Sequence, residues 1–311
     1  MSSPASPAVH AADEGPGAGA PRGPGSRLTA AFVIANLVGH LIVATGGAVR
    51  LTASGLGCST WPQCEPGSFT PEFREALSIH PYVEFGNRLI AVVLALVAVV
   101  VALRVGRDRS RARSLRVLAL VPLLGVLAQA VIGGLSVLAS LHPAVVGSHM
   151  LVSLALVSTS TVLLHRYRDS DAPARVAVSP RVLGLGRGLA LVSVPVLVLG
   201  VITTGAGPHS GDEAIGYRFA LDPYAMARLH SLSVWVFVAL LVALLVATRR
   251  GPARLRRRLV LLAVATGAQG LIGYVQLFTG LPEVLVGGHV LGAALLAAAT
   301  TYAYLGLRQR G

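Results

Sequence analysis

Eight long apolar stretches, separated by short polar segments, form the main pattern along the chain. Each is close to the roughly 20 apolar residues that a helix needs to cross the hydrocarbon core of a bilayer. The pattern therefore predicts an all-α polytopic membrane protein with eight transmembrane helices. The predicted spans lie at about 28–48, 82–103, 115–139, 145–164, 188–205, 225–247, 258–279 and 284–306.

The segments outside these spans suggest the domain organisation. Residues 1–26 are rich in Ala, Pro, Gly and Ser and carry no apolar run, so we expect a disordered cytoplasmic tail. Residues 27–166 and 187–306 each contain four predicted helices and form an N-terminal and a C-terminal half. We expect a cytoplasmic linker at 167–186 and a short cytoplasmic tail at 307–311.

Arginines alternate between rich and poor connections. The rich connections 104–116, 165–187 and 248–258 hold six, five and six Arg; the poor ones, 49–81, 140–144, 206–224 and 280–283, hold two, none, one and none. Excess positive charge in short loops marks the cytoplasmic side of a membrane protein. We therefore expect a multi-pass protein of the cell membrane with both termini in the cytoplasm.

Composition agrees with a membrane protein and argues against a nucleic-acid partner. Of the 311 residues, 54% are hydrophobic and 13% charged, and the net charge is +13. The charged fraction is about half that of an ordinary soluble domain. Since the positive charge is concentrated in connections between apolar runs, it is explained by membrane topology rather than by nucleic-acid binding.

An internal repeat relates the two halves. Segment 128–149 (AQAVIGGLSVLASLHPAVVGSH) resembles segment 268–289 (AQGLIGYVQLFTGLPEVLVGGH) at an offset of 140 residues. The matched pairs are Gln129 and Gln269, Gly133 and Gly273, and His149 and His289. Because each half has an even number of helices, both copies enter the membrane in the same direction. We predict two tandem four-helix bundles related by a pseudo-two-fold axis along the membrane normal.

The second half contains a candidate haem site. Ionisable residues within spans are costly and mark function by default, and we expect those of the even-numbered helices within their first turns. His230 and His289 come from two different helices, and two imidazoles facing each other across a bundle can hold a haem iron from both sides. The alternative is two histidines hydrogen-bonded to neighbouring helices. Arg228 would suit a haem propionate near the outer surface.

The first half offers a different set of residues at the corresponding level. His149 is expected opposite Glu84, Asn87 and Arg88, and Asn87 stands where a second histidine would be expected. Because Asn is a poor iron ligand, this pocket would bind iron from one side, which leaves a coordination position open for oxygen chemistry. Glu84 would be a proton shuttle; the alternative is a buried ion pair with Arg88.

The remaining histidines and the two cysteines lie outside these pockets. Cys58 and Cys64 share the longest predicted outer loop, where a disulfide can persist; the alternative is two free thiols in a mobile loop. His80 is close enough in sequence to reach the first pocket. The other histidines are interpreted as structural or solvated: His40, His142, His165 and His209.

Taken together, residues 28 to 306 resemble the haem A synthase family. The resemblance rests on GGAVRLTASGLGC after the first helix, the paired cysteines, the E-F-x-x-R element at Glu84–Arg88 and the late histidines. It implies oxidation of the C8 methyl group of haem O to the formyl group of haem A by two successive hydroxylations. In the family's usual E-x-x-H-R pattern, His occupies the position of Asn87.

The resemblance also implies roles for the candidate residues. It implies a haem b in the second half with His230 and His289 as axial ligands, and the substrate haem O in the first half with His149 as a ligand. Glu84 matches the family's essential carboxylate, and Cys58 and Cys64 match a loop pair that often forms a disulfide.

The partners expected are the lipid bilayer, a haem O synthase that would pass on the substrate, and an electron donor outside the chain. A homo-oligomer is compatible with this reading. Two other functions remain as alternatives. One is a di-haem electron-transfer cytochrome without oxygen insertion, and the other is a transporter, since internal repeats are common in transporters.

Overall fold

The computed structural model describes residues 24–40, 43–72, 79–214 and 217–310. The helices of the first half are α1 (Pro24–His40), α2 (Val43–Leu51), α3 (His80–Gly106), α4 (Arg113–Leu118), α5 (Val121–Leu138) and α6 (Pro143–Arg168). Those of the second half are α7 (Pro180–Ala206), α8 (Pro223–Ala247), α9 (Ala253–Phe278) and α10 (Glu283–Leu305). In the described residues, eight helical segments are long and apolar enough to cross a membrane, which confirms the predicted all-α polytopic class.

One of the predicted spans is divided in the structure, and another includes two residues that lie outside the described part of the chain. The third consists of α4 and α5, and the break lies just before Pro122, which lacks an amide hydrogen and disfavours helical geometry in the residue before it. The first consists of α1 and α2, and residues 41–42 between them lie outside the described residues. Helix α1 begins at Pro24, within the segment expected to be a tail, whereas residues 1–23 of that segment lie outside the described residues.

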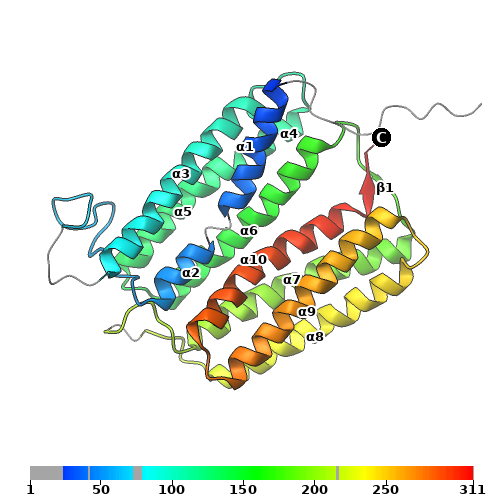
Figure 1. The fold of residues 1–311 in the computed structure, drawn as a ribbon. Helices are drawn as coiled ribbons and strands as arrows, with labels where there is room; N and C mark the ends of the chain where they lie inside the picture. Colours follow the sequence, from blue (N-terminus) through cyan, green and yellow to red (C-terminus); the bar gives the residue numbers. More distant parts are fainter. Residues whose placement is uncertain (1–23, 41–42, 73–78, 215–216, 311) are drawn as a thin grey trace, which may run out of the picture.

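Each half is a ring of four spans (Figure 1). In the first half, α1 and α5 each contact both α3 and α6; in the second, α7 and α9 each contact both α8 and α10. Thus α3 and α6 lie diagonally across one bundle, and α8 and α10 lie diagonally across the other. Buried clusters fill both bundles, including Val101 and Leu163 in the first and Phe237 and Leu262 in the second.

The two halves meet along α6 and α10 (Figure 1). Helix α7 also packs on α6, and α2 packs on α10, so the last helix of each half contacts the first span of the other. A buried cluster containing Val43, Leu154, Val157, Ala294 and Ala297 seals this junction. The two bundles therefore stand side by side, while the pseudo-two-fold axis stays a prediction.

A small sheet joins the predicted linker to the predicted C-terminal tail. Strand β1 (Arg175–Val176) pairs antiparallel with β2 (Arg308–Gln309). Helices α6 and α7 take up both ends of the predicted linker, which leaves only residues 169–179 between them. Beside the sheet, burial acts to raise the pKa of the Asp171 carboxyl, but hydrogen bonds from the Arg111 guanidinium and the Ala112 amide outweigh it and lower the pKa below its usual range.

The bundle has two distinct ends. We call the end with this strand pair the sheet end, and the opposite end, with the Cys58–Cys64 bridge, the disulfide end (Figure 1). All three Arg-rich connections lie at the sheet end, because each follows a span that begins at the disulfide end. The positions of these connections agree with the expected topology, and the cytoplasmic assignment of the sheet end stays a prediction.

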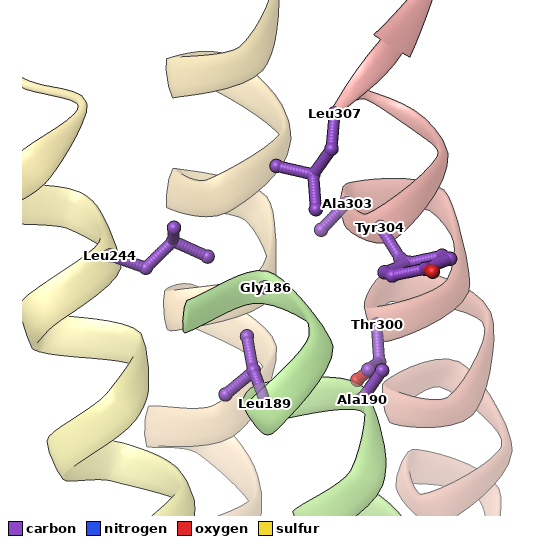
Figure 2. A pocket seen from close by; sticks show the side chains of 8 residues that line it. All are labelled: Gly186, Leu189, Ala190, Leu244, Thr300, Ala303, Tyr304 and Leu307. Atoms are coloured by element: carbon purple, nitrogen blue, oxygen red, sulfur yellow. The ribbon is translucent and has the colours of Figure 1, made fainter. Parts of the chain in front are cut away.

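A small, mostly apolar pocket lies near the sheet end of the second half (Figure 2). Its lining residues are Gly186, Leu189, Ala190, Leu244, Thr300, Ala303, Tyr304 and Leu307. Gly186 is 14 residues before Gly200, the α7 residue that touches His230, a distance of about 21 Å at 1.5 Å of rise per residue. The pocket is therefore separate from the predicted histidine sites.

Candidate functional site

His230 and His289 face each other across the second half. His230 lies on α8 and His289 on α10, the two diagonal helices of this bundle. Their ring centroids are 6.4 Å apart and their planes are nearly perpendicular, at 87°. Both lie in the second turn of their helices rather than the first, because α8 begins at Pro223 and α10 at Glu283.

Small residues on the neighbouring helices make room for these rings. A side-chain carbon at Gly200 of α7 would lie 3.1 Å from the His230 ring, and one at Gly273 of α9 would lie 3.3 Å from the His289 ring. The carbonyl oxygen of Val196 lies 3.0 Å from His230 Nδ1, which holds that ring on α7. His289 Nδ1 is buried without a hydrogen-bond partner among the described residues.

The arrangement of the two rings fits a haem between them. With a metal–nitrogen distance of roughly 2.0–2.1 Å, two imidazoles on opposite sides of one metal place their centroids about 6 Å apart. The observed separation of 6.4 Å agrees with this value. Two imidazoles fill only two coordination positions of a metal ion. The remaining ligands must therefore come from the bound group, as the porphyrin nitrogens do in a haem. Arg228 is exposed two residues before His230 on α8, about half a turn nearer the disulfide end, and its propionate role stays a prediction.

The first half repeats one side of this arrangement. His149 lies on α6, and a side-chain carbon at Gly133 of α5 would lie 3.3 Å from its ring, the same distance as in the Gly273–His289 pair. Gln129 Nε2 donates to the carbonyl oxygen of His149, which ties α5 to α6 at this level. The repeated glycine therefore leaves room for an imidazole in both halves.

The other side of the first-half site differs. Asn87 of α3 occupies the position predicted for a second ligand, and its Oδ1 accepts a hydrogen bond from Thr45 Oγ1 of α2 at 2.7 Å. The amide oxygen is therefore engaged with the first span. This geometry is compatible with the predicted one-sided pocket, in which His149 alone would hold the iron.

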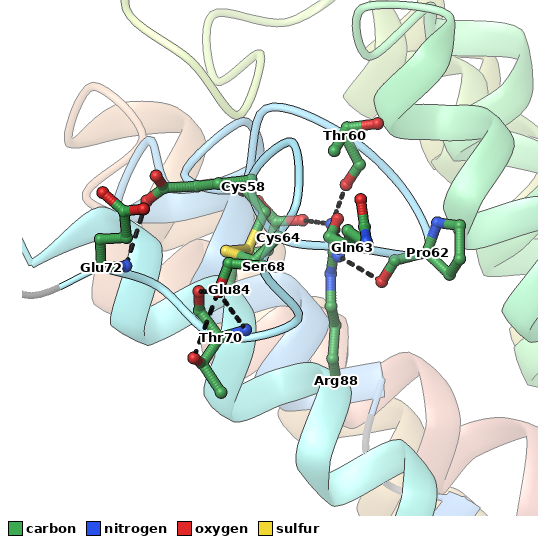
Figure 3. The surroundings of a disulfide bond; sticks show 11 residues. Cys58, Thr60, Pro62, Gln63, Cys64, Ser68, Thr70, Glu72, Glu84 and Arg88 are labelled. Atoms are coloured by element: carbon green, nitrogen blue, oxygen red, sulfur yellow. Dashed lines mark hydrogen bonds and ion pairs between the residues drawn. A yellow bond between two sulfur atoms is a disulfide. The ribbon is translucent and has the colours of Figure 1, made fainter.

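The buried carboxylate of Glu84 and the half-buried guanidinium of Arg88 form an ion pair at the disulfide end (Figure 3). Arg88 Nη2 lies 2.5 Å from Glu84 Oε1, one helical turn apart on α3. Glu84 Oε2 accepts from the backbone amide of Cys58 at 2.7 Å. The ion pair with Arg88, which was the alternative to a proton-shuttle role for Glu84, is thus present. It also anchors the loop, because the carboxylate joins α3 to the chain at Cys58.

The loop after α2 is closed and held in place. Cys58 and Cys64 form the predicted disulfide, and both cysteines are fully buried (Figure 3). Arg88 donates to the carbonyl oxygens of Thr60 and Gln63 at 3.0 and 3.1 Å, on both sides of Trp61. The Trp61 ring lies against Gly134 of α5, where a side-chain carbon would come within 2.4 Å of it.

The other histidines in the described part of the chain make structural contacts. His40 is buried at the end of α1, and its Nδ1 lies 2.6 Å from the Asn36 carbonyl oxygen. His80 Nδ1 lies 2.9 Å from Ser54 Oγ, so this ring joins the loop to the start of α3. The contacts of the remaining three are with backbone or neighbouring side chains: His142 with Ala144, His165 with Asp169 and Tyr302, and His209 with Leu281.

Arg50 is a bridging residue that sequence analysis did not single out. It lies on α2 in the first half, yet it donates to the carbonyl oxygens of Thr204 and His209 in the second half, at 2.9 and 2.6 Å. Through it, the loop ends of the two bundles are joined. The only sequence signal for Arg50 was its place in the GGAVRLTASGLGC segment. Its bridging role could not be predicted from this segment, because its partners lie more than 150 residues away.

Known proteins resemble the chain over most of the first half and beyond. The profile of the COX15-CtaA family, cytochrome oxidase assembly protein, matches residues 29–221, which include Glu84 and His149 and end before α8. A haem A synthase of Lysinibacillus sphaericus is 26% identical over 220 residues, covering 69% of this chain and 70% of the relative.

Shorter alignments point to the same family. A haem A synthase of Geobacillus kaustophilus is 30% identical over 139 residues, 44% of this chain and 42% of the relative. One of Bacillus cereus is 32% identical over 126 residues, 40% of this chain and 39% of the relative. In these two cases the chain matches less than half of the relative's length. Since the family profile alone covers well over half of the chain, the chain belongs to the haem A synthase family of cytochrome oxidase assembly proteins.

Proposed function

We propose that this chain is a haem A synthase that oxidises the C8 methyl group of haem O to a formyl group. The observation that carries the proposal is the His230–His289 pair at 6.4 Å in a member of this family. The first hydroxylation gives an alcohol, the second gives a hydrate, and loss of water gives the formyl group. Each hydroxylation uses one O₂, two protons and two electrons and releases one water, and the electrons come from a donor outside the chain.

In this proposal the second half holds a resident haem b, which supplies one-electron transfer when bound. His230 and His289 would be its axial ligands, and the Val196 carbonyl near His230 Nδ1 orients one of the rings. Arg228 would pair with a propionate. Gly200 and Gly273 keep the space beside the two rings free, which allows the imidazoles to lie close to α7 and α9.

The first half would bind the substrate, haem O, with His149 on one side of its iron. Asn87 would hydrogen-bond near the other side, where a position stays open for oxygen chemistry. This asymmetry favours the synthase over the alternative of a di-haem electron-transfer cytochrome, in which both halves would need two filled axial positions.

Glu84 would hold or move a proton at its carboxylate oxygens beside the substrate. One oxygen is paired with Arg88 and the other with the Cys58 amide, so the group is fixed in position without a flexible rotamer. A carboxylate held in this way beside the substrate would suit proton transfer in each hydroxylation.

The proposed setting is the cell membrane, with the sheet end and both termini in the cytoplasm. The histidine sites would then lie near the outer surface. Haem O would be passed from a haem O synthase, since a sparingly soluble substrate is best transferred within the membrane. A homo-oligomer is compatible with this arrangement.

Turnover by the purified protein tests the proposal. The protein in lipid nanodiscs is supplied with haem O, O₂ and a chemical reductant, and the haems are extracted and identified by mass. The proposal predicts haem A and its alcohol intermediate in the extract. Purified protein that binds haem but converts no haem O would instead identify a cytochrome.

A further inference from the structure

The two halves differ in what covers the helix seam beside the histidine. In the first half the seam lies between α3 and α5, and in the second between α8 and α9. At the repeat offset of 140 residues, Gly134 of α5 corresponds to Tyr274 of α9. Each residue follows the glycine that touches the predicted ligand ring, Gly133 or Gly273. The two seams can therefore be compared at the same level of the bundle.

The seam of the second half is covered by its own helices. Tyr274 OH lies 3.0 Å from Ser231 Oγ of α8 and accepts from Trp235 Nε1 of the same helix at 3.1 Å. These contacts tie α8 to α9 on a face where Tyr274 is 42% and Trp235 is 59% exposed, as expected for side chains that meet lipid. This cover consists of side chains that belong to the two helices themselves.

The seam of the first half is covered by a loop side chain instead. Gly134 is buried because the Trp61 ring lies on it, and α3 contributes the Arg88 hydrogen bonds that fix the loop at Thr60 and Gln63. On both helices the surrounding side chains are apolar and exposed, including Leu89 and Leu135 at 50% and 49%. This cover belongs to a loop and is not part of a transmembrane helix.

We propose that the α3–α5 seam is the port through which a membrane-dissolved tetrapyrrole enters and leaves the first-half site, and that Trp61 is its removable cover. The inference rests on the proposed function, in which the first half binds an exchanging substrate and the second a resident haem. An exchanging ligand needs an opening that closes again, whereas a resident cofactor benefits from a fixed wall. The disulfide keeps the loop short, so Trp61 returns to the same place on Gly134.

The glycine at position 134 is what permits this cover. An alanine side-chain carbon there would lie 2.4 Å from the Trp61 ring, so the ring would have to leave the seam. The variant Gly134→Ala therefore unseats Trp61 without changing the loop itself. Gly270→Ala is the matched control, because Gly270 lies within α9 and a side-chain carbon there would have nothing within 4 Å.

The test measures haem release from the full chain in lipid nanodiscs loaded with haem O, with apomyoglobin as the acceptor. Wild-type protein is expected to release the first-half haem in a fast phase and the second-half haem in a slow one. Trp61→Ala and Gly134→Ala should each speed the fast phase by about tenfold, the effect of losing one aromatic contact of roughly 1.4 kcal/mol. The slow phase should not change, and Gly270→Ala should alter neither phase.

A double variant separates a port cover from general loosening of the loop. Trp61→Ala combined with Gly134→Tyr supplies the first half with a cover on the helix itself, as Tyr274 is in the second. The proposal predicts that release from the first half then slows to or below the wild-type rate. A loop that merely became disordered would not be rescued by a tyrosine on α5.

Three outcomes would overturn the inference while leaving the proposed function intact. These are an unchanged fast phase in Trp61→Ala, equal acceleration of both phases, and a double variant as fast as Trp61→Ala alone. A wild-type protein that binds haem O in neither half would contradict the proposed function itself. Counting free thiols in each variant verifies that the Cys58–Cys64 bridge has formed.

Discussion

The two halves share a helix arrangement but differ in what surrounds the repeated histidine, His149 or His289. His149 and His289 each lie on the last helix of their half, against a glycine at the same distance. In the second half a second imidazole faces this ring, and in the first half Asn87 is bonded to Thr45 instead. The shared histidine and glycine explain how both halves could bind a tetrapyrrole. The second imidazole, present in one half only, explains how the second half could hold a haem permanently while the first half could oxidise one.

The halves also differ at the disulfide end. The first half has Glu84 and Arg88 beneath a disulfide-closed loop, whereas the second has a tyrosine and a tryptophan on its own helices. The carboxylate and the disulfide-closed loop therefore lie in the first half alone among the described residues of these two sites. This difference supports the proposal of proton transfer and ligand exchange in the first half and of a resident haem in the second.

The largest expected effect comes from the predicted ligands. His230→Ala or His289→Ala should remove the tightly held haem of the second half, because one axial imidazole holds iron less firmly than two. His149→Ala should abolish binding of haem O in the first half and leave the second-half haem in place. Haem content and spin state, read from absorption spectra, measure both effects. If His230→Ala and His289→Ala both keep a low-spin haem, these residues are not its ligands.

The next largest effect is expected at Glu84. Glu84→Gln keeps the shape and the contact with the Cys58 amide but cannot exchange a proton at neutral pH. Haem A formation should fall by about 10²-fold or more, within the range of general acid–base catalysis. Haem b should stay bound, since it lies in the other half. The ratio of haem A to haem O in extracts measures the loss, and a wild-type ratio would leave Glu84 only its structural ion pair.

A smaller effect is expected at the fixed cover of the second half. Tyr274→Gly removes the contacts to Ser231 and Trp235. It places a glycine at the position that corresponds to Gly134, but no loop side chain takes the place of the lost tyrosine ring. Release of the second-half haem should become faster by about fivefold, because two exposed hydrogen bonds, each at the lower end of about 0.5–1.5 kcal/mol, are lost while both imidazoles remain. Apomyoglobin capture measures the rate. An effect larger than that of Trp61→Ala on the first half would reverse the proposed contrast.

The smallest effect is expected at Asn87. Asn87→Ala removes one hydrogen bond, and at the lower end of about 0.5–1.5 kcal/mol its loss should weaken haem O binding by only about twofold to threefold. Asn87→His should make the substrate haem more low-spin and slow its turnover, because the open position would be filled. Optical titration with haem O and the haem A yield measure these changes. Damage as severe as that of His149→Ala would show that Asn87 acts at the iron or at the methyl group.

The eight spans and the two histidines that pair were predictable because they depend on local patterns. Span length follows from bilayer thickness, and a matched Gln and His at one offset reveals a duplication. The helix starts were predicted too late at Pro143, Pro180 and Pro223, since the apolar run begins after the first turn. The signal was present: Ser179 and Asp222 accept hydrogen bonds from backbone amides two or three residues into the helix, and proline suits the first helical position.

The covers of the two seams and the link between the halves could not be predicted in this way. Trp61 and Gly134 are 73 positions apart in the sequence, and Arg50 bonds to residues more than 150 positions away. Such contacts depend on how the bundles and the loop pack, and neither hydropathy nor periodicity encodes them. The ion pair of Glu84 and Arg88 was foreseeable, because residues four apart share a helix face.

The central claim is that one half holds a resident haem and the other an exchanging one. The most direct measurement is the absorption spectrum, with mass analysis of extracted haem, of wild-type protein, His149→Ala and His289→Ala purified in parallel. A resident haem in the second half predicts a low-spin haem b in wild type and in His149→Ala, and its loss in His289→Ala. A low-spin haem b that disappears in His149→Ala and persists in His289→Ala would contradict this assignment of the two halves.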